Sequence, residues 1–336
     1  MNIYLYPKVF PCENPYIIDL ENSLSSNFAI INKKSNQIGV LDLFKYFLRT
    51  DIYYFNWIES LPSRRYGKIQ IIAFVVFLIL AKWFKKKIVW TLHNKYTHDK
   101  NKNGWVDYMY NTMMEHSDII FTHSQSGIDF VKEKYPASLK KIKYFIHPVK
   151  PLLPAIHNKK CIYDFFIWGT IWPYKGVIEF LRFLKESEKL HPLKILIVGR
   201  CINNQIRTEL DKYLRSNITY KDEFYSIEEI AGFSNQAKFT LFTYKSESVL
   251  SSGSLMDSIR MRSVIIGPDT GAFRDLSSYD FVKTYNTYGE IIEICNKYEP
   301  IRDTMLTEID KFCEENSWDS FGKSLNKALI SNLIIK

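Results

Sequence analysis

Short apolar runs alternate with longer stretches of helical character along nearly the whole chain. In the first half the apolar runs are NIYLYP, FAII, DIYYFNWI, KIVWTLHN, DIIFTHS and KKIKYFIHP, and helical stretches separate them near 15–25, 40–48, 71–84, 104–116 and 125–135. Strands that alternate with helices form parallel sheets whose two faces are covered by those helices. The pattern therefore predicts an α/β fold. It also predicts where ligands bind, because open parallel sheets bind them beyond the carboxyl ends of their strands.

A second series of the same kind follows, with the apolar runs YDFFIWGT, LKILIVGR, ITYKDEF, KFTLFTY, SVIIGP and FVKTY. Between the two series, residues 149–160 contain two prolines and few periodic apolar residues, which is typical of a linker. A chain of 336 residues is also long for one domain and suits two. We predict two Rossmann-like, doubly wound domains that face each other across a cleft, residues 1–150 and 151–320. The segment 321–336 is expected to be a helix that packs back on the first domain.

The excess of positive charge lies entirely in the first half. Residues 1–150 hold 21 Lys and Arg against 12 Asp and Glu, whereas residues 151–336 hold 24 of each, and the net charge is +9. Such an excess attracts nucleic acid, an anionic membrane or a phosphorylated substrate. Nucleic acid is the least favoured of these partners, because the lysines are interspersed with apolar strands and no recognition module is visible.

Cysteine usage and the first residues indicate a cytoplasmic protein. The cysteines are odd in number, scattered and without C-x-x-C spacing, so neither a disulfide framework nor a zinc site is indicated. They are Cys12, Cys161, Cys201, Cys295 and Cys313. The first residues, MNIYLYP, resemble a strand and lack the basic region and apolar core of a signal peptide.

The longest apolar stretch, residues 71–84, has two interpretations. It reaches about 14 residues, fewer than the roughly 17–25 that a helix needs to cross a bilayer. Basic residues flank it on both sides, and Trp83 suits a headgroup boundary, so the helix could lie on the inner membrane surface. A helix buried in the core is also apolar on every side, so this second interpretation stays open.

Two strand-to-helix junctions in the second half carry groups that bind phosphate. The first, FIWGTIWPYKGV, places Gly169 and Thr170 just past a strand and Lys175 and Gly176 at the start of a helix. Free backbone N–H groups, a helix N-terminus and an ammonium group together form a diphosphate site. The alternative is that Gly169 only makes a turn and Lys175 is solvated.

The second junction, SSGSLMD, is expected to hold the other side of a diphosphate. Gly253 permits close backbone approach, the hydroxyls of Ser252 and Ser254 cap the helix, and Asp257 accepts hydrogen bonds from ribose hydroxyls. An ordinary serine N-cap and a solvated Asp257 are the alternatives. The sequence contains no D-x-D motif, so nothing indicates a donor held through a metal ion.

Acid–base candidates follow strands of the first half. In KIVWTLHNKYTH, His93 comes directly after a strand and Asp99 lies in the loop that follows, and Glu59 comes after DIYYFNWI. Each could act as a general base, although a structural histidine and solvated carboxylates are the alternatives. His123 and His147 also follow strands and are expected to support the site or to lie between the domains.

At these residues the chain resembles the GT-B glycosyltransferases of the glycogen-synthase-like and bacterial capsule and exopolysaccharide group, over nearly its whole length. IWGTIWPYKGV is similar to that group's Gly-Arg and Lys-Gly segment. SSGSLMDSIRMRSVIIGPDTGAFRDL resembles its Glu-x7-Glu element and closing Gly-Gly turn, and WTLHNKYTH resembles its N-terminal histidine loop. The resemblance implies that Lys175 binds the donor diphosphate, Asp257 replaces the ribose-binding glutamate and His93 contacts the donor sugar.

The chain departs from this pattern at three positions. Thr170 stands where the arginine is usual, Val249 where the first glutamate is usual, and Arg262 where a glycine commonly ends the helix. In retaining members the first glutamate lies near the sugar, so its loss leaves an inverting mechanism open unless Glu247 substitutes for it. Inversion needs a base that deprotonates the acceptor hydroxyl, and the candidates are His93, Glu59 and Asp99.

The expected function is that of a metal-independent hexosyltransferase without a separate cofactor. It would transfer a hexose from a UDP- or GDP-sugar in the C-terminal domain to a lipid-linked saccharide acceptor in the N-terminal domain. The expected setting is bacterial surface polysaccharide synthesis, at the cytoplasmic face of the inner membrane. Two alternatives stay open: a nucleotide-sugar epimerase or hydrolase, and a catalytically weakened partner that binds sugar nucleotides for a transferase.

Overall fold

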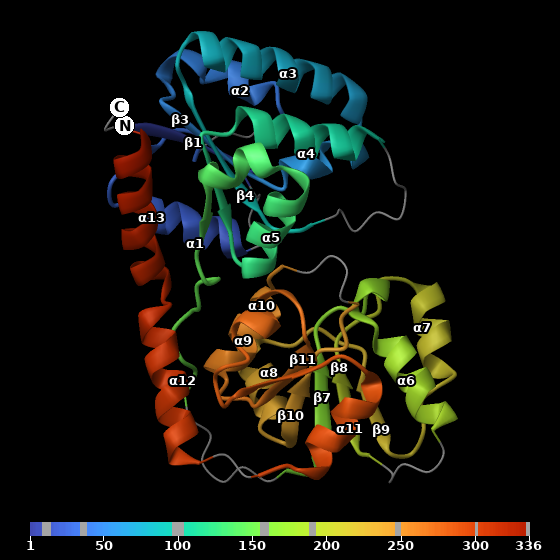
Figure 1. Ribbon diagram of the computed structural model, residues 1–336. Helices are drawn as coiled ribbons and strands as arrows, with labels where there is room; N and C mark the ends of the chain where they lie inside the picture. The colour runs from blue at the N-terminus through green and yellow to red at the C-terminus, as the bar shows by residue number, and fades with distance from the viewer. Residues whose placement is uncertain are drawn as a thin grey trace. The chain divides into compact units, whose positions relative to one another are not determined.

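The computed structural model describes residues 1–8, 15–33, 39–95, 104–154, 161–187, 193–245, 250–299 and 302–333. The chain forms two compact units (Figure 1). The first unit comprises Met1–Pro148 together with Trp318–Lys336, and the second comprises Val149–Ser317. In each unit the described residues form a six-stranded parallel sheet flanked by helices, which confirms the predicted α/β class.

The sheet of the first unit has the strand order β2-β1-β3-β4-β5-β6. Its strands are β1 (Asn2–Tyr6), β2 (Ala29–Ile30), β3 (Ile52–Asn56), β4 (Lys87–Leu92), β5 (Ile119–Thr122) and β6 (Ile142–Tyr144). The helices are α1 (Pro15–Leu24), α2 (Asp42–Lys45), α3 (Gly67–Trp83), α4 (Gly104–His116), α5 (Gln125–Lys134) and α13 (Trp318–Leu333), with 3-10 helices η1 (Phe47–Arg49), η2 (Ile58–Ser63) and η3 (Pro136–Lys141). Because β2 lies on one side of β1 and β3 on the other, the loops after β1 and β3 diverge there.

Side-chain alternation buries both faces of this sheet, as expected of parallel strands. Tyr54 and Val89 point to the face that α1 and α13 cover, where they share one apolar cluster with Phe321. Figure 1 shows α13 beside α1, although the two helices come from opposite ends of the chain. Phe55 points to the other face and contacts Phe74 of α3, with ring centroids 5.3 Å apart.

The sheet of the second unit has the order β12-β11-β10-β7-β8-β9. Its strands are β7 (Tyr163–Trp168), β8 (Ile195–Val198), β9 (Ile218–Lys221), β10 (Ala237–Leu241), β11 (Ile265–Pro268) and β12 (Val282–Tyr285). The helices are α6 (Val177–Glu186), α7 (Asn204–Asp211), α8 (Ile227–Ser234), α9 (Gly253–Arg260), α10 (Gly271–Asp275), α11 (Tyr288–Asn296) and α12 (Asp303–Glu315), with the 3-10 helix η4 (Pro173–Lys175). This is the strand order of dinucleotide-binding folds, with its reversal point between β7 and β10.

Some local elements differ from expectation. The helix expected near 40–48 is divided into α2 and η1, and the rings of Phe44 and Phe47 both contact Phe77 of α3. Residues three positions apart lie on the same side of a 3-10 helix, so the shared contact of Phe44 and Phe47 with Phe77 favours 3-10 geometry. The helices η2 and α10 were not expected. Within the described residues, no helix has both the length and the apolar character needed to cross a membrane.

The helix α3 is not buried on every side, so the interpretation as a pure core helix is wrong. Phe74 and Phe77 are fully buried against the sheet, whereas Ile72 is 62% exposed and Trp83 76% exposed. The apolar stretch therefore supplies both a core face and a face directed at solvent.

Candidate functional site

The reversal point of the second unit brings together the loops that follow β7 and β10. Gly176 adopts a left-handed conformation (φ 67°), and a Cβ there would collide with the carbonyl oxygen of Thr243. The Thr243 hydroxyl donates to the carbonyl of Lys175 (2.6 Å), and the backbone N–H of Lys245 donates to that of Tyr174 (3.0 Å). These contacts hold Lys175 at the reversal point, where ligands bind in folds of this kind.

The ammonium group of Lys175 is buried and has no counter-ion among the described residues. The residue is only 7% exposed, and no described carboxylate lies within ion-pair distance of it. Burial lowers the pKa of Lys175 to about 8. Gly169 is left-handed (φ 87°), and a Cβ there would lie 2.9 Å from Nζ, so glycine allows the ammonium to lie against the backbone. A buried cation without a partner is stabilised by a bound anion.

The N-terminus of α9 differs from expectation in one respect. Ser252 occupies the N-cap position, but its hydroxyl accepts no hydrogen bond from the helix and lies 3.4 Å from the Tyr244 hydroxyl instead. The expected serine cap is therefore wrong. Apart from its chain neighbours and its own helix backbone, no described atom lies within 4 Å of where a Cβ of Gly253 would be, so packing against these residues does not require glycine here. The buried hydroxyl of Ser251 has no hydrogen-bond partner among the described residues.

Thr170 lies at the first junction and Asp257 at the second, and the two side chains have different surroundings. Asp257 Oδ1 accepts a hydrogen bond from Arg260 Nε (2.7 Å), an i,i+3 ion pair within α9. Arg260 is itself buried and donates to the carbonyl of Pro151. Thr170 is half-buried beyond the end of β7. The ribose-binding role of Asp257 stays a prediction.

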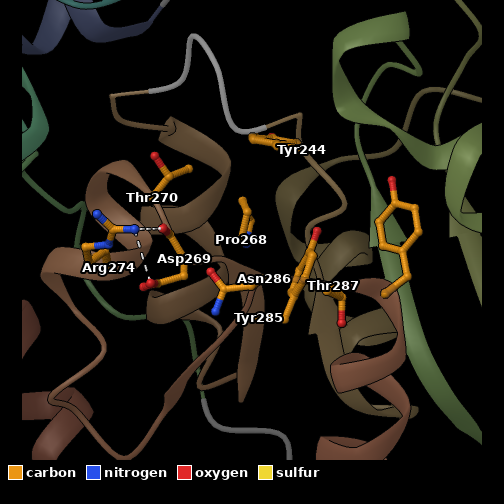
Figure 2. Close-up of a pocket in the computed structure, with 9 residues that line it drawn as sticks. Tyr244, Pro268, Asp269, Thr270, Arg274, Tyr285, Asn286 and Thr287 are labelled. Carbon is orange, nitrogen blue, oxygen red and sulfur yellow. Dashed lines mark hydrogen bonds and ion pairs between the residues drawn. The ribbon is translucent and has the colours of Figure 1, made fainter.

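A pocket of 570 Å³ opens beyond the carboxyl ends of β11 and β12 (Figure 2). Its lining consists of Tyr244, Pro268, Asp269, Thr270, Arg274, Tyr285, Asn286, Thr287 and Tyr288. Arg274 donates to the carboxylate of Asp269 (3.1 Å), which Figure 2 shows at one side of the pocket.

Tyr244 joins the pocket to the two predicted junctions. It lines the pocket, its hydroxyl lies beside Ser252, and its ring centroid is 5.9 Å from Lys175 Nζ. Lys175, the start of α9 and the pocket therefore form one continuous region. Sequence reasoning assigned a role to no individual residue of this lining, although the segment SVIIGPDTGAFRDL contains several of them. The available signal was their position after strands of the second series.

In the first unit, three histidines gather beyond the ends of neighbouring strands. His93 follows β4, His123 follows β5 and His147 follows β6. The ring centroids of His93 and His123 are 5.9 Å apart, and those of His123 and His147 are 5.1 Å apart. Tyr16 of α1 contacts all three rings, and its hydroxyl lies 2.8 Å from His123 Nε2.

Hydrogen bonds determine which nitrogen of His93 and of His123 carries the proton. The side-chain amide of Asn56 donates to the carbonyl of Tyr6 (3.3 Å), so its Oδ1 accepts from His93 Nε2 (3.0 Å). The lone pair of His93 is therefore on Nδ1. In His123, Nδ1 donates to a backbone carbonyl (3.0 Å), so Nε2 accepts from the hydroxyl of Tyr16.

Burial disfavours the protonated form of all three histidines. Burial, reinforced by the two neighbouring imidazoles, holds the pKa of His93 well below its ordinary value. Burial also lowers the pKa of His123 to about 3 and that of His147 to about 4. Trp57 stacks on His93 (4.2 Å between centroids) from a left-handed backbone conformation (φ 50°), an unusual one for a bulky residue. A neutral, oriented imidazole can accept a proton or hydrogen-bond a sugar hydroxyl.

Glu59 does not lie with the histidines. It is 2% exposed, and its carboxyl accepts from the indole N–H of Trp90 (3.3 Å), which packs against α4 on the other face of the sheet. Burial raises the pKa of Glu59 to about 7. The structure therefore does not bring Glu59 and His93 together as a pair.

Four residues singled out in the sequence, Cys12, Asp99, Glu247 and Val249, lie outside the described residues. In the part of the chain that the structure describes, no group of three His, Cys, Asp or Glu side chains could hold a metal ion.

No protein-family model matches the chain, and no curated protein matches it in sequence. Several solved structures do match it. Anabaena HepE in complex with UDP-glucose has a TM-score of 0.68 at 12% identity, covering 98% of this chain and 99% of that one. An E. coli trehalose-6-phosphate structure bound with UDP-2-fluoro-glucose has a TM-score of 0.66 at 10% identity, covering 100% and 99%. The α,α-trehalose-phosphate synthase (UDP-forming) of Burkholderia vietnamiensis has a TM-score of 0.60 at 10% identity, covering 84% and 72%.

At such low identity these similarities establish the fold rather than the activity. The match extends over nearly the whole chain and includes both sheets. The chain has the GT-B fold, and its resemblance to GT-B glycosyltransferases is confirmed at the level of that fold.

Proposed function

We propose that this protein is a glycosyltransferase that transfers a hexose from a nucleotide sugar to a saccharide acceptor. The observation that carries the proposal is the ammonium group of Lys175, which is buried at the reversal point of the second sheet and meets no counter-ion in the part of the chain that the structure describes. The diphosphate of a nucleotide sugar has the charge that this group lacks, and the adjoining 570 Å³ pocket offers room for the rest of the donor.

We favour a UDP-sugar as the donor, with a GDP-sugar as the second choice. Solved structures of the same fold hold UDP-glucose and UDP-2-fluoro-glucose. Metal-independent transfer is part of the proposal, because Lys175 and the start of α9 would offset the charge of the leaving diphosphate. Gly169, Thr170, Gly176, Ser252, Gly253, Ser254 and Asp257 would surround the donor.

The first domain is proposed to hold the acceptor. His93 would contact the transferred sugar or accept the proton of the acceptor hydroxyl through Nδ1, since Asn56 engages Nε2. Glu59 and Asp99 are retained as the other candidate bases.

The proposed setting is bacterial surface polysaccharide synthesis, such as capsule or exopolysaccharide, on a lipid-linked acceptor at the cytoplasmic face of the inner membrane. The exposed apolar face of α3 supports a peripheral contact with lipid, since solvent-exposed isoleucines on one helix face are typical of interfacial helices. The basic first half of the chain supports the same contact.

The test is calorimetric titration of UDP and GDP into the wild type and into Lys175→Ala. We expect at least one nucleotide to bind the wild type and the substitution to weaken that binding by about tenfold or more, because an ion pair to a buried charge is lost. The matched control is Lys297→Ala, which removes an exposed lysine of the same unit and should leave the affinity unchanged. Equal nucleotide affinity in wild type and Lys175→Ala would contradict the proposed donor site.

Turnover separates transfer from the alternatives. With a donor that binds, His93→Ala should slow transfer to a saccharide acceptor far more than it weakens nucleotide binding. Donor breakdown or epimerisation without any acceptor would indicate an epimerase or hydrolase instead. Tight binding without turnover, over a panel of donors and acceptors, would indicate a binding partner.

A further inference from the structure

One face of α3 presents a stripe of apolar side chains to solvent. Its members recur every three or four residues and are between 44% and 76% exposed: Ile69, Ile72, Val76, Ile79 and Trp83. The helix lies along the outside of the first unit (Figure 1). We call these residues the apolar stripe. A contiguous apolar face of this length marks a contact with another apolar surface.

A pocket of 790 Å³ opens where α3 ends, and we call it the lysine pocket. Six lysines line it: Lys82, Lys85, Lys86, Lys87, Lys140 and Lys141. It lies at the amino ends of β4 and β5, because Lys87 begins β4 and Asp118 precedes β5. His93 and His123 follow the carboxyl ends of the same two strands, so the lysine pocket is separate from the candidate site.

Two of the six lysines have polar partners within the fold, and Lys86 Nζ lies over the ring of Phe47, 5.8 Å from its centroid. Lys141 Nζ donates to the carbonyls of Met114 (3.0 Å) and Glu115 (2.7 Å) and so caps the end of α4. Lys87 Nζ lies 3.4 Å from the carboxylate of Asp118. The other four lysines form no ion pair with any described residue. The pocket therefore carries positive charge that the neighbouring helix ends and carboxylates do not neutralise.

The backbone conformation at position 85 is unfavourable for lysine. Its backbone is left-handed (φ 53°), its N–H donates to the carbonyl of Lys82 (3.1 Å), and the N–H of Lys86 donates to that of Ala81 (2.8 Å). These two bonds form a Schellman motif, whose left-handed position is usually glycine. Glycine would relieve the strain, so the stability of the fold does not explain a lysine here.

A second polar group in the lysine pocket lacks a partner. Ser117 lines the pocket and is 2% exposed, and its hydroxyl has no hydrogen-bond partner in the described part of the chain. A buried hydroxyl without a partner is unfavourable, and a phosphate oxygen would satisfy it. An anion in the pocket would thus meet unpaired ammonium groups and a free donor together.

We propose that the lysine pocket binds the phosphate headgroup of an anionic phospholipid while the apolar stripe lies in the bilayer interface. Lipid is favoured over a soluble phosphate because exposed Trp83 and Phe84, at the end of the stripe, adjoin the lysines. The inference rests on the membrane contact of the proposed function and is independent of the donor site.

The experiment measures binding of the purified protein to phosphatidylcholine vesicles with and without phosphatidylglycerol. The variant is Lys85→Gly with Lys140→Gln, and the matched control is Lys132→Gln with Lys143→Gln, two exposed lysines of the same unit outside the pocket. We expect the pocket variant to lose about thirtyfold in affinity for phosphatidylglycerol vesicles, the control to lose much less, and both to match the wild type on phosphatidylcholine alone. Thermal unfolding of Lys85→Gly alone should occur at a temperature no lower than in the wild type, which excludes misfolding as the cause.

Three results would overturn the proposal. Equal losses in the pocket variant and the control would show a diffuse charge effect, and equal wild-type binding to both vesicle types would show no headgroup preference. Binding of inorganic phosphate in calorimetry that is lost in the pocket variant, without any vesicle binding, would assign a soluble anion instead. UDP titration of the pocket variant is the separate readout, and it should match the wild type whether or not the donor proposal holds.

Discussion

At the scale of single residues, the candidate chemistry depends on ionisable groups whose charge the fold disfavours. Lys175, Glu59, His93 and His123 are buried and His147 is half-buried, and desolvation is the first cause of every pKa shift among them. Such shifts arise at functional sites but also at purely structural positions. Glu59 is the residue for which a measurement separates the two possibilities most directly.

We predict that Glu59→Gln removes a pH-dependent loss of stability. The pKa of Glu59 rises from 4.5 to about 7 on folding, so the folded state holds the proton more tightly. The contribution of Glu59 to wild-type stability should therefore fall as pH rises from 4.5 to 7, by at most about 3 kcal/mol, and this loss should level off above pH 7. Glutamine is neutral throughout and keeps an oxygen that accepts from Trp90.

The measurement is urea unfolding of both proteins from pH 4.5 to above 7. The free energy of unfolding of Glu59→Gln minus that of the wild type should increase across this window. The histidines act in the opposite sense, because their lowered pKa values reduce stability as pH falls below 6.5. They are present in both proteins, so their contributions cancel in the difference between the two free energies of unfolding. A flat difference would contradict the prediction. Loss of transfer with unchanged stability would identify Glu59 as the base.

At the scale of elements, α3 performs two tasks with its two faces. We predict that Ile72→Ser with Ile79→Ser changes the free energy of unfolding by only about 0.5 kcal/mol per site, because both side chains are exposed. Phe77→Ala on the opposite face should cost about 3–5 kcal/mol, because its ring is fully buried in the aromatic core. Urea unfolding checks both values.

Vesicle binding distinguishes the apolar stripe from the lysine pocket. The double serine variant should bind phosphatidylcholine and phosphatidylglycerol vesicles less well by the same factor, since it removes apolar area and no charge. A loss confined to phosphatidylglycerol would contradict the separate roles of the two features. A large loss of stability would show that another element covers the stripe.

Most elements could be predicted from the sequence because their period is local. The apolar runs of β3 and β7, for example, are visible in any window that contains them. The faces of α3 were not predictable, because a helix with apolar residues on every side has no preferred direction until the sheet is placed. Tyr244 was missed because its neighbour Lys175, far away in the sequence, adjoins it only through the strand order. Arg260, which donates to Asp257, lies three residues further along the sequence and was visible there. Nothing in the sequence decides whether Asp257 binds Arg260 or a ribose.

At the scale of the whole molecule, the two units bury separate cores. Leu325 of α13 lies in the cluster beneath α1, so the last helix completes the first unit although the whole second unit precedes it in the chain. Leu210 lies in a cluster made only of second-unit residues. Both side chains are fully buried, which provides a matched pair of probes.

We predict two thermal transitions, one for each unit, that respond to different changes. Leu325→Ala should lower the transition of the first unit and Leu210→Ala that of the second, each through a loss of about 2–5 kcal/mol. UDP at a hundred times its dissociation constant should stabilise only the second unit, by about 2.7 kcal/mol, because the proposed donor site lies wholly within it. Calorimetric scans of the wild type and both variants, with and without UDP, test this assignment.

If UDP raised the transition that Leu325→Ala lowers, the donor would contact the first unit as well. The N-terminal half would then share in donor binding, as the histidine loop of the resemblance implies.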